Sequence, residues 1–228
     1  MASVLFILTS HDALGDTGNK TGFYIDEMAA PYWALVDAGH DVTLASVKGG
    51  KPPIDPHSLD DDPEKRPAPV RRFLDDAEAS ARLEDTAAIA DVTAEGYDAV
   101  FLPGGHGTMW DFAENADVAR LVSEVHGKGG VVGAVCHGPV GLLGATTADG
   151  SPLVKGVRIS GFTNSEEKEV GLADAVPYLL EERLRAQGAK FEDTGNWNVL
   201  AVTDNRIVTG QNPQSAPEVG KQLVAALA

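Results

Sequence analysis

The chain has 228 residues, of which 43% are apolar and 23% charged, and 18 Lys and Arg stand against 34 Asp and Glu, for a formal net charge of −16. This length suffices for one hydrophobic core, and the composition argues against wholesale disorder. The acidic surface disfavours nucleic acid and anionic membrane faces as partners. A single cysteine cannot form an internal disulfide, so a reducing compartment, by default the cytoplasm, is expected.

The first elements alternate between strand and helix patterns. Residues 4–9 form a compact apolar run, typical of a strand buried on both faces. Apolar positions recur at helical spacing over 20–38, and Gly39 stands where a helix C-cap would lie. Residues 41–46 alternate as a second strand. No apolar run approaches the roughly 18 residues that span a bilayer, so no membrane-spanning segment is expected.

Residues 48–95 differ from the rest of the chain. Prolines recur at 52, 53, 56, 63, 67 and 69, and an acidic run lies at 60–62. Such proline spacing forbids a long regular element, and the segment is too long for an ordinary connection. The segment is therefore either a cap with functional contacts or a mobile insertion, and we expect a cap or lid.

The strand and helix alternation resumes after this insertion. Strands are predicted over 97–102 and 131–135, with an amphipathic helix over 116–126 between them, as in a right-handed crossover unit. Further strands are expected at 157–160, 199–203 and 206–209, and further helices at 175–187 and 217–227. The pattern predicts a single α/β domain over 1–228, with a doubly wound, mostly parallel sheet and helices on both faces.

The most specific signal is the turn at Cys136. An apolar strand delivers this residue into a turn of small residues, and Gly138-Pro139 is typical of a helix start. The pattern resembles a nucleophile elbow, which exposes a side chain at the carboxyl end of a sheet and near a helix N-terminus that favours a thiolate. The alternative is a buried structural cysteine. Ala134 occupies a position where the hydrolase motif has Gly, so serine hydrolase chemistry is not implied.

Two motifs, residues 103–107 and 134–139, together resemble the ThiJ/PfpI superfamily, whose fold is similar to that of class I glutamine amidotransferases. Residues 22–27, 161–164 and 209–216 resemble its branch of glutathione-independent glyoxalases (glyoxalase III) and heat-inducible chaperones. The similarity spans nearly the whole chain. It implies a flavodoxin-like form of the predicted α/β fold, and it leaves a homodimer open because close relatives often form dimers.

The resemblance implies catalytic roles for four residues. Cys136 would be the nucleophile, and Glu27 from the first helix would act as general acid and base beside it. His137 would face an acid on the loop after position 161, for which Glu167 is preferred and Glu166 is the alternative. For each glutamate, a solvated position on a helix remains the competing interpretation.

The loop at 103–107 would supply the remaining contacts. The resemblance places the backbone amides of Gly105 and His137 as an oxyanion hole. His106 would contact the substrate, or else serve as a polar loop residue. The glycines of this loop lack the full Gly-x-Gly-x-x-Gly pattern, so no nicotinamide cofactor is expected.

The activity implied by the resemblance is that of a glyoxalase III-type lyase, the D-lactate dehydratase type. It would convert methylglyoxal or glyoxal to lactate or glycolate through a hemithioacetal on Cys136, so the expected partner is a small aldehyde. No cofactor is expected, and no metal, because a metal site would require tertiary convergence of scattered histidines. Two alternatives stay open: a cysteine amidase, peptidase or protein deglycase using the same site, and a stress-related holding chaperone.

Overall fold

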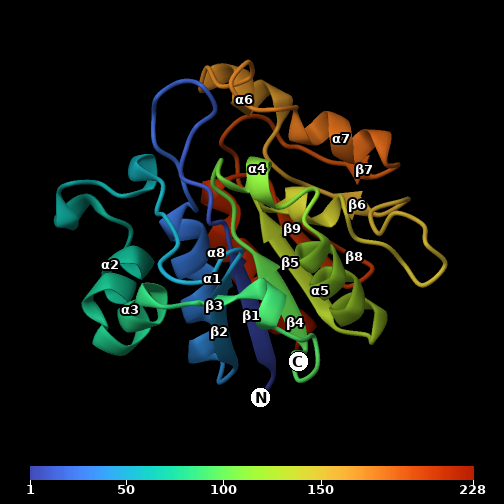
Figure 1. Ribbon diagram of the computed structural model, residues 1–228, viewed down its shortest axis with the longest axis horizontal. Coiled ribbons are helices and arrows are strands. Elements are labelled where there is room, and N and C mark those ends of the chain that lie inside the picture. The colour runs from blue at the N-terminus through green and yellow to red at the C-terminus, as the bar shows by residue number, and fades with distance from the viewer.

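A computed structural model describes residues 1–228. Seven strands form one sheet in the order β3-β2-β1-β4-β5-β9-β8, and all neighbours are parallel except β8 and β9 (Figure 1). Its strands are β1 (Ser3–Leu8), β2 (Asp41–Ser46), β3 (Ala87–Ala88), β4 (Ala99–Leu102), β5 (Val131–Val135), β8 (Ala201–Asp204) and β9 (Ile207–Gly210). This topology confirms the predicted doubly wound, mostly parallel α/β fold.

Helices cover both faces of the sheet. In the view of Figure 1, α5 lies in front of the sheet and α8 behind it. The helices are α1 (Ile25–Asp37), α2 (Ala68–Asp75), α3 (Ala77–Glu84), α4 (Thr108–Asp111), α5 (Ala116–Gly127), α6 (Asn164–Glu169), α7 (Leu180–Ala186) and α8 (Ala216–Ala226). None of them combines the length and the hydropathy that crossing a bilayer requires.

The sheet separates two hydrophobic cores because its side chains alternate between faces. Leu5 and Ile7 of β1 pack into the core beneath α5, whereas Val4, Phe6 and Leu8 pack into the core beneath α1 and α8. All five side chains are fully buried. This double burial explains why β1 reads as a continuous apolar run.

The order of the strands creates a topological switch point between β1 and β4. The chain leaves β1 to form β2 on one side and later returns to form β4 on the other. Loops diverge at the carboxyl ends of these strands, and this is where open α/β sheets bind ligands. Both chain termini lie at the opposite end of the molecule (Figure 1).

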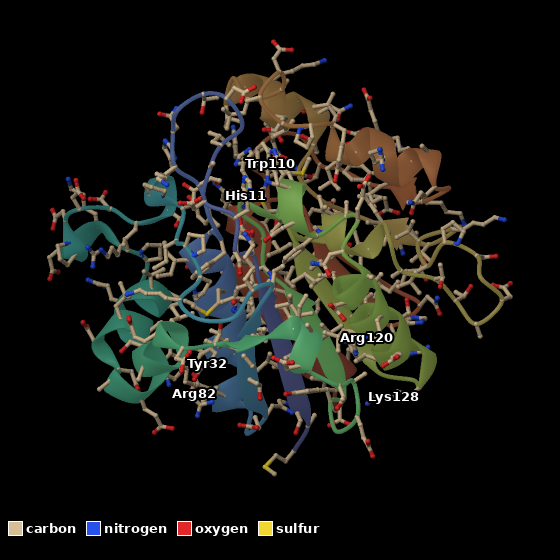
Figure 2. All side chains as sticks on the ribbon, in the orientation of Figure 1. His11, Tyr32, Arg82, Trp110, Arg120 and Lys128 are labelled. Carbon is tan, nitrogen blue, oxygen red and sulfur yellow. The ribbon has the colours of Figure 1, made fainter.

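The loop after β1 is fastened to α4 at this carboxyl end. Asp111 accepts hydrogen bonds from the Thr9 hydroxyl and the Ser10 N–H, both at 2.8 Å. His11 stacks on Trp110 with ring centroids 5.0 Å apart, and Figure 2 shows the two labelled side chains together. These contacts fix the position of the loop after β1 relative to α4 at the switch point.

Several elements differ from the sequence-based expectation, among them the helix expected over 175–187, which is limited to α7, Leu180–Ala186. The first helix begins at Ile25, because residues before it are extended, with Phe23 N–H donating to Pro53 O at 2.9 Å. The strand predicted at 157–160 shortens to β6 (Arg158–Ile159), which leaves the main sheet and pairs with β7 (Lys190–Phe191). The segment after the cysteine turn is a five-residue 3-10 helix, Gly138–Leu142.

The insertion over 48–95 divides into two parts. Residues up to 67 contain only short 3-10 helices and run along the carboxyl end of the sheet, where Asp55 N–H donates to Phe23 O at 2.9 Å. The helices α2 and α3 instead pack beside α1, where Tyr32 and Phe73 meet edge to face (Figure 2 labels Tyr32 and Arg82 in this layer). Only the first part reaches the switch point.

Candidate active site

Cys136 follows β5 directly and adopts a left-handed backbone conformation with φ of 58°. Two hydrogen bonds fix this turn: Cys136 N–H donates to Gly210 O at 3.0 Å, and Cys136 O accepts from Phe162 N–H at 2.8 Å. Non-glycine residues seldom adopt this conformation, which costs on the order of 1–3 kcal/mol and is concentrated at functional sites. The strained turn directs Cys136 to the wall of a cavity.

The Cys136 thiol is 3% exposed, and burial, together with the adjacent Glu27 carboxyl, raises its pKa well above the usual value. This direction is opposite to the lowered pKa that a helix N-terminus after the turn predicts. The physical reason is that Gly138–Leu142 forms a short 3-10 helix, whose dipole does not offset complete burial beside an acid.

Glu27 lies in the first turn of α1 and is fully buried. Its Oε2 accepts a hydrogen bond from Gly104 N–H at 2.8 Å, whereas its Oε1 is buried without a partner of regular geometry. The Cys136 thiol is close enough for each of these two groups to influence the pKa of the other. Burial raises the pKa of Glu27 well above its ordinary value.

On the other side of the cysteine, one carboxylate bridges two imidazoles. Glu167 Oε2 lies 2.7 Å from His137 Nε2, and Glu167 Oε1 lies 2.8 Å from His106 Nε2. Burial alone would raise the pKa of Glu167, but its interactions with the His137 and His106 rings, which both donate hydrogen bonds to it, outweigh burial and hold that pKa well below its usual range. Glu167 is therefore an ionised acceptor.

His137 connects this carboxylate to the thiol. Burial, reinforced by His106, lowers the pKa of His137, so its ring is neutral at pH 7. Because Nε2 donates its proton to Glu167, Nδ1 is left as an acceptor, 3.3 Å from Cys136 Sγ. The ring is thus oriented to take the proton of the thiol.

The structure separates the two neighbouring glutamates of α6. Glu166 is buried in a capping box with Thr163 and also accepts hydrogen bonds from Gln211 and Asn212, each at 2.9 Å. It therefore binds the C-terminal loops together, and Glu167 is the acid that reaches His137. The Thr-x-x-Glu spacing at 163–166 is a sequence signal for the capping box that would have made this distinction.

Gly105 and His137 present backbone N–H groups that donate to no acceptor within the protein. Gly105 has φ of 99°, and a side chain there would collide with the backbone at Gly22 and Tyr24. This conformation is accessible to glycine at little cost. Both N–H groups adjoin the Cys136 cavity, as the expected oxyanion hole requires.

The cavity at this site has a volume of about 430 Å³, within the ordinary range for small-molecule pockets. It is lined by residues from the loops that follow β1, β2, β4, β5 and β9 and from the segment between β6 and β8: Leu14, Asn19, Tyr24, Asp55, His57, Gly105, His106, Cys136, His137, Phe162, Val170, Leu172, Trp197, Pro213 and Gln214. Of the six predicted site residues, Gly105, His106, Cys136 and His137 line it directly, while Glu27 and Glu167 lie buried behind them.

Several wall residues were missed by sequence reasoning. Phe162 packs against the His137 ring with centroids 4.5 Å apart, and Trp197 lies 5.8 Å beyond Phe162. Burial and the nearby Glu27 raise the pKa of Tyr24 to about 12, so this phenol stays a neutral donor. From the insertion come Asp55 and His57, whose Oδ1 and Nδ1 lie 3.1 Å apart. Phe162 lies in the motif at 161–164, but no sequence pattern around His57 or Trp197 indicates that these residues line the cavity.

No dinucleotide-type phosphate cradle is formed by the glycine-rich loop, because Gly104 N–H is already bound to Glu27. Three side chains do form a metal-compatible group: His106, His137 and Glu167 each offer one ligand atom, and these atoms lie within 4.8 Å of one another. The three residues come from separate segments of the chain and meet only in the folded structure. The spacing of histidines in the sequence therefore does not predict this group.

Comparison with known proteins places this arrangement in context. The chain is 33% identical to a protein of Saccharomyces cerevisiae named glutathione-independent glyoxalase HSP31, over 98% of this chain and 97% of that one. It superimposes on glyoxalase III from Candida albicans with a TM-score of 0.89 and 33% identity, covering 99% and 97% of the two chains. With Rapid Encystment Protein 24 kDa of Francisella tularensis the TM-score is 0.94 at 37% identity, over the full length of both chains.

A family model extends over most of the chain. The DJ-1/PfpI family matches residues 21–226, a range that includes the cysteine turn, the glycine-rich loop and both buried glutamates of the site. The resemblance expected from the motifs at 103–107 and 134–139 is thereby confirmed. The chain belongs to the DJ-1/PfpI family.

Proposed function

We propose that this protein is a glutathione-independent glyoxalase, a lyase that converts methylglyoxal or glyoxal to lactate or glycolate through a covalent adduct on Cys136. The names of the relatives in Saccharomyces and Candida support this activity. The observation that carries the proposal is the fully buried Glu27 carboxyl group, which has one oxygen without a partner and lies across Gly104 from the turn that carries Cys136 and His137. The two residues supply a nucleophile and a proton carrier at one site.

In the first step, the thiol of Cys136 adds to the aldehyde carbon of the substrate. A carbon–sulfur bond forms, the sulfur proton passes to the His137 Nδ1 lone pair, and the carbonyl oxygen becomes an oxyanion. The N–H groups of Gly105 and His137 stabilise that negative charge, and the oxyanion then takes the proton from the His137 imidazolium, which leaves a neutral hemithioacetal and a neutral ring. Because Glu167 is ionised, it stabilises the imidazolium that forms transiently.

In the second step, Glu27 moves a proton between neighbouring carbons of the adduct. Its carboxylate takes the proton from the former aldehyde carbon, and the resulting enediol is reprotonated at the adjacent carbon. The hemithioacetal becomes a thioester without any net gain or loss of atoms. The raised pKa of Glu27 matches a carboxyl group that both accepts and donates a proton near neutral pH.

In the third step, water cleaves the thioester. Neutral His137 accepts a proton from the attacking water, the carbon–sulfur bond breaks, and the hydroxy acid leaves while Cys136 regains its proton. The overall reaction adds one water to the 2-oxoaldehyde. The reacting carbons need neither glutathione nor a redox partner in this scheme.

The first part of the insertion serves as a cap in this proposal. Asp55 and His57 form one wall of the cavity, and Tyr24 and Gln214 complete it next to them. These side chains restrict the entrance to small substrates. The remaining wall, Phe162 with Trp197, shields the His137 ring from bulk water.

The deciding experiment measures lactate produced from methylglyoxal without glutathione. We expect turnover by the wild type, none above background for Cys136→Ala, and a loss of about 10²- to 10⁴-fold in kcat for Glu27→Gln, the range that a general acid and base contributes. Glu169→Gln is the matched control, because this glutamate lies on α6 outside the cavity and is fully exposed. Absence of lactate from correctly folded wild type, or full activity of Glu27→Gln, would contradict the proposal.

A further inference from the structure

The group formed by His106, His137 and Glu167 has the composition of a transition-metal site. Two imidazoles and one carboxylate are ligands that Zn²⁺ prefers, and three protein ligands with an open fourth position are typical of zinc sites that remain accessible. The side chains of His137 and Glu167 are 1% and 3% exposed, while that of His106 is 15% exposed and lines the cavity. An ion could therefore enter from the cavity side only.

The spacing of the ligand atoms also suits a metal. The two carboxylate oxygens lie 2.7 and 2.8 Å from the Nε2 atoms, and no pair of ligand atoms exceeds 4.8 Å. Zinc bonds of about 2.1 Å at a tetrahedral angle separate ligand atoms by about 3.4 Å, so modest side-chain rotations suffice.

We propose that His106, His137 and Glu167 form a binding site for Zn²⁺, and that its occupation inhibits the enzyme. Water from the cavity would complete the coordination. Cys136 is not a ligand, because its sulfur faces Nδ1 of His137, on the opposite side of the ring from Nε2. The binding site is independent of the proposed function, whereas the inhibition depends on it.

The inhibition follows from where the ring proton must go. Zinc bound at Nε2 of His137 displaces the proton that Glu167 now accepts, and the neutral ring carries that proton on Nδ1 instead. Nδ1 then donates toward Cys136 Sγ, and the ring has no lone pair left to accept the thiol proton. No bond to the substrate is involved, and removing zinc restores the original tautomer.

Co²⁺ alone serves as the probe, because its visible absorption reports the coordination of a zinc site. We expect wild type to bind one Co²⁺ per chain with visible d–d bands and with no sulfur-to-cobalt charge-transfer band in the near ultraviolet. Cys136→Ala should give the same spectrum. His106→Gln and Glu167→Gln should weaken binding at least tenfold, since losing even an indirect partner of a metal ligand costs about 10- to 100-fold.

His57→Gln is the matched control, because it removes a histidine that lines the same cavity but does not belong to the group of three. It should bind Co²⁺ like the wild type. Loss of the spectrum in Cys136→Ala, a thiolate charge-transfer band, or unchanged binding by His106→Gln would each overturn the site. Circular dichroism and the thermal midpoint of each variant establish that it is folded, and the partly exposed His106 position is the safest of the three to change.

A second measurement tests the inhibition. Zn²⁺ should suppress lactate formation by the wild type, and a chelator should restore it fully. If zinc fills the site and leaves lactate formation unchanged, the inhibitory role is wrong. If the protein makes no lactate at all, the proposed function fails, but the Co²⁺ titration still decides whether the metal site exists.

Discussion

Two buried glutamates of the site, Glu27 and Glu167, differ in their hydrogen-bond partners and in the direction of their pKa shifts. Glu27 has one hydrogen bond from a backbone N–H and an oxygen without a regular partner, and its pKa is raised. Glu167 accepts from two imidazoles, and its pKa is lowered. The neighbours of each carboxyl group, rather than its depth, decide whether it holds a proton. One cavity thereby contains both a proton carrier and a permanent anion.

The largest effect on stability is expected from removing the anion. Glu167→Gln leaves two N–H donors facing an amide with only one acceptor oxygen, and we expect a loss of about 1–3 kcal/mol in the free energy of unfolding. Because the folded pKa of Glu167 is lowered, its contribution is complete above the ordinary carboxyl pKa and is lost as the pH falls through the folded value. Chemical denaturation at several pH values should show the variant approaching wild type only in acid. A constant difference would contradict this assignment.

The opposite pH dependence is expected for Glu27→Gln. Because the folded pKa of Glu27 is raised, its neutral form stabilises the protein at low pH, and that stability is lost as the pH rises through the folded value. The variant should therefore gain on wild type with rising pH, by up to about 1.4 kcal/mol for each pH unit of difference between the folded and unfolded pKa. Thermal midpoints of both proteins from pH 5 to pH 9 give the comparison. A difference between the two proteins that stays constant from pH 5 to pH 9 would contradict a raised pKa of Glu27.

A smaller effect should follow from relieving the strained turn between the two glutamates. Cys136→Gly and Cys136→Ala both remove the thiol, but only glycine accepts φ of 58° without strain. We expect the glycine variant to be more stable by about 0.5–1 kcal/mol, after allowing for the extra entropy of glycine in the unfolded chain. Urea denaturation of the two variants measures the difference. Greater stability of the alanine variant would mean that the turn relaxes when the thiol is removed.

The smallest effect is expected at Glu169, two positions from Glu167. Its Oε1 accepts from Trp197 Nε1 at 2.8 Å, but the carboxyl group is fully exposed. Exposed pairs of this kind contribute little, so Glu169→Gln should leave the thermal midpoint and the pH profile unchanged. A marked shift would show that burial is not what distinguishes the effective glutamates of this region.

The parts of the site that are local in sequence were predictable. Cys136 and its turn are encoded by an apolar strand followed by small residues, and strand 41–46 was predicted at the bounds that the structure has. The first helix was predicted to start too early, because apolar side chains at helical spacing also occur in the extended segment that pairs with Pro53.

The unpredicted parts depend on contacts between distant segments. A run such as 138–142 does not reveal whether it forms an α-helix or a short 3-10 helix, yet that difference removes the expected dipole from Cys136. The raised pKa of the thiol arises from burial and from Glu27, which lies 109 positions earlier in the chain. His57 and Trp197 likewise reach the cavity only through the path of long loops.

Gly104 carries the connection between the two halves of the site. A β-carbon at this position would lie 2.5 Å from Glu27 Oε2 and 2.7 Å from His137 N, so one methyl group would press on the acid and on the turn at once. Glu27 and the turn that carries Cys136 can therefore approach each other only because residue 104 has no side chain. A glycine is therefore required at position 104 if Glu27 and the cysteine turn are to keep these positions.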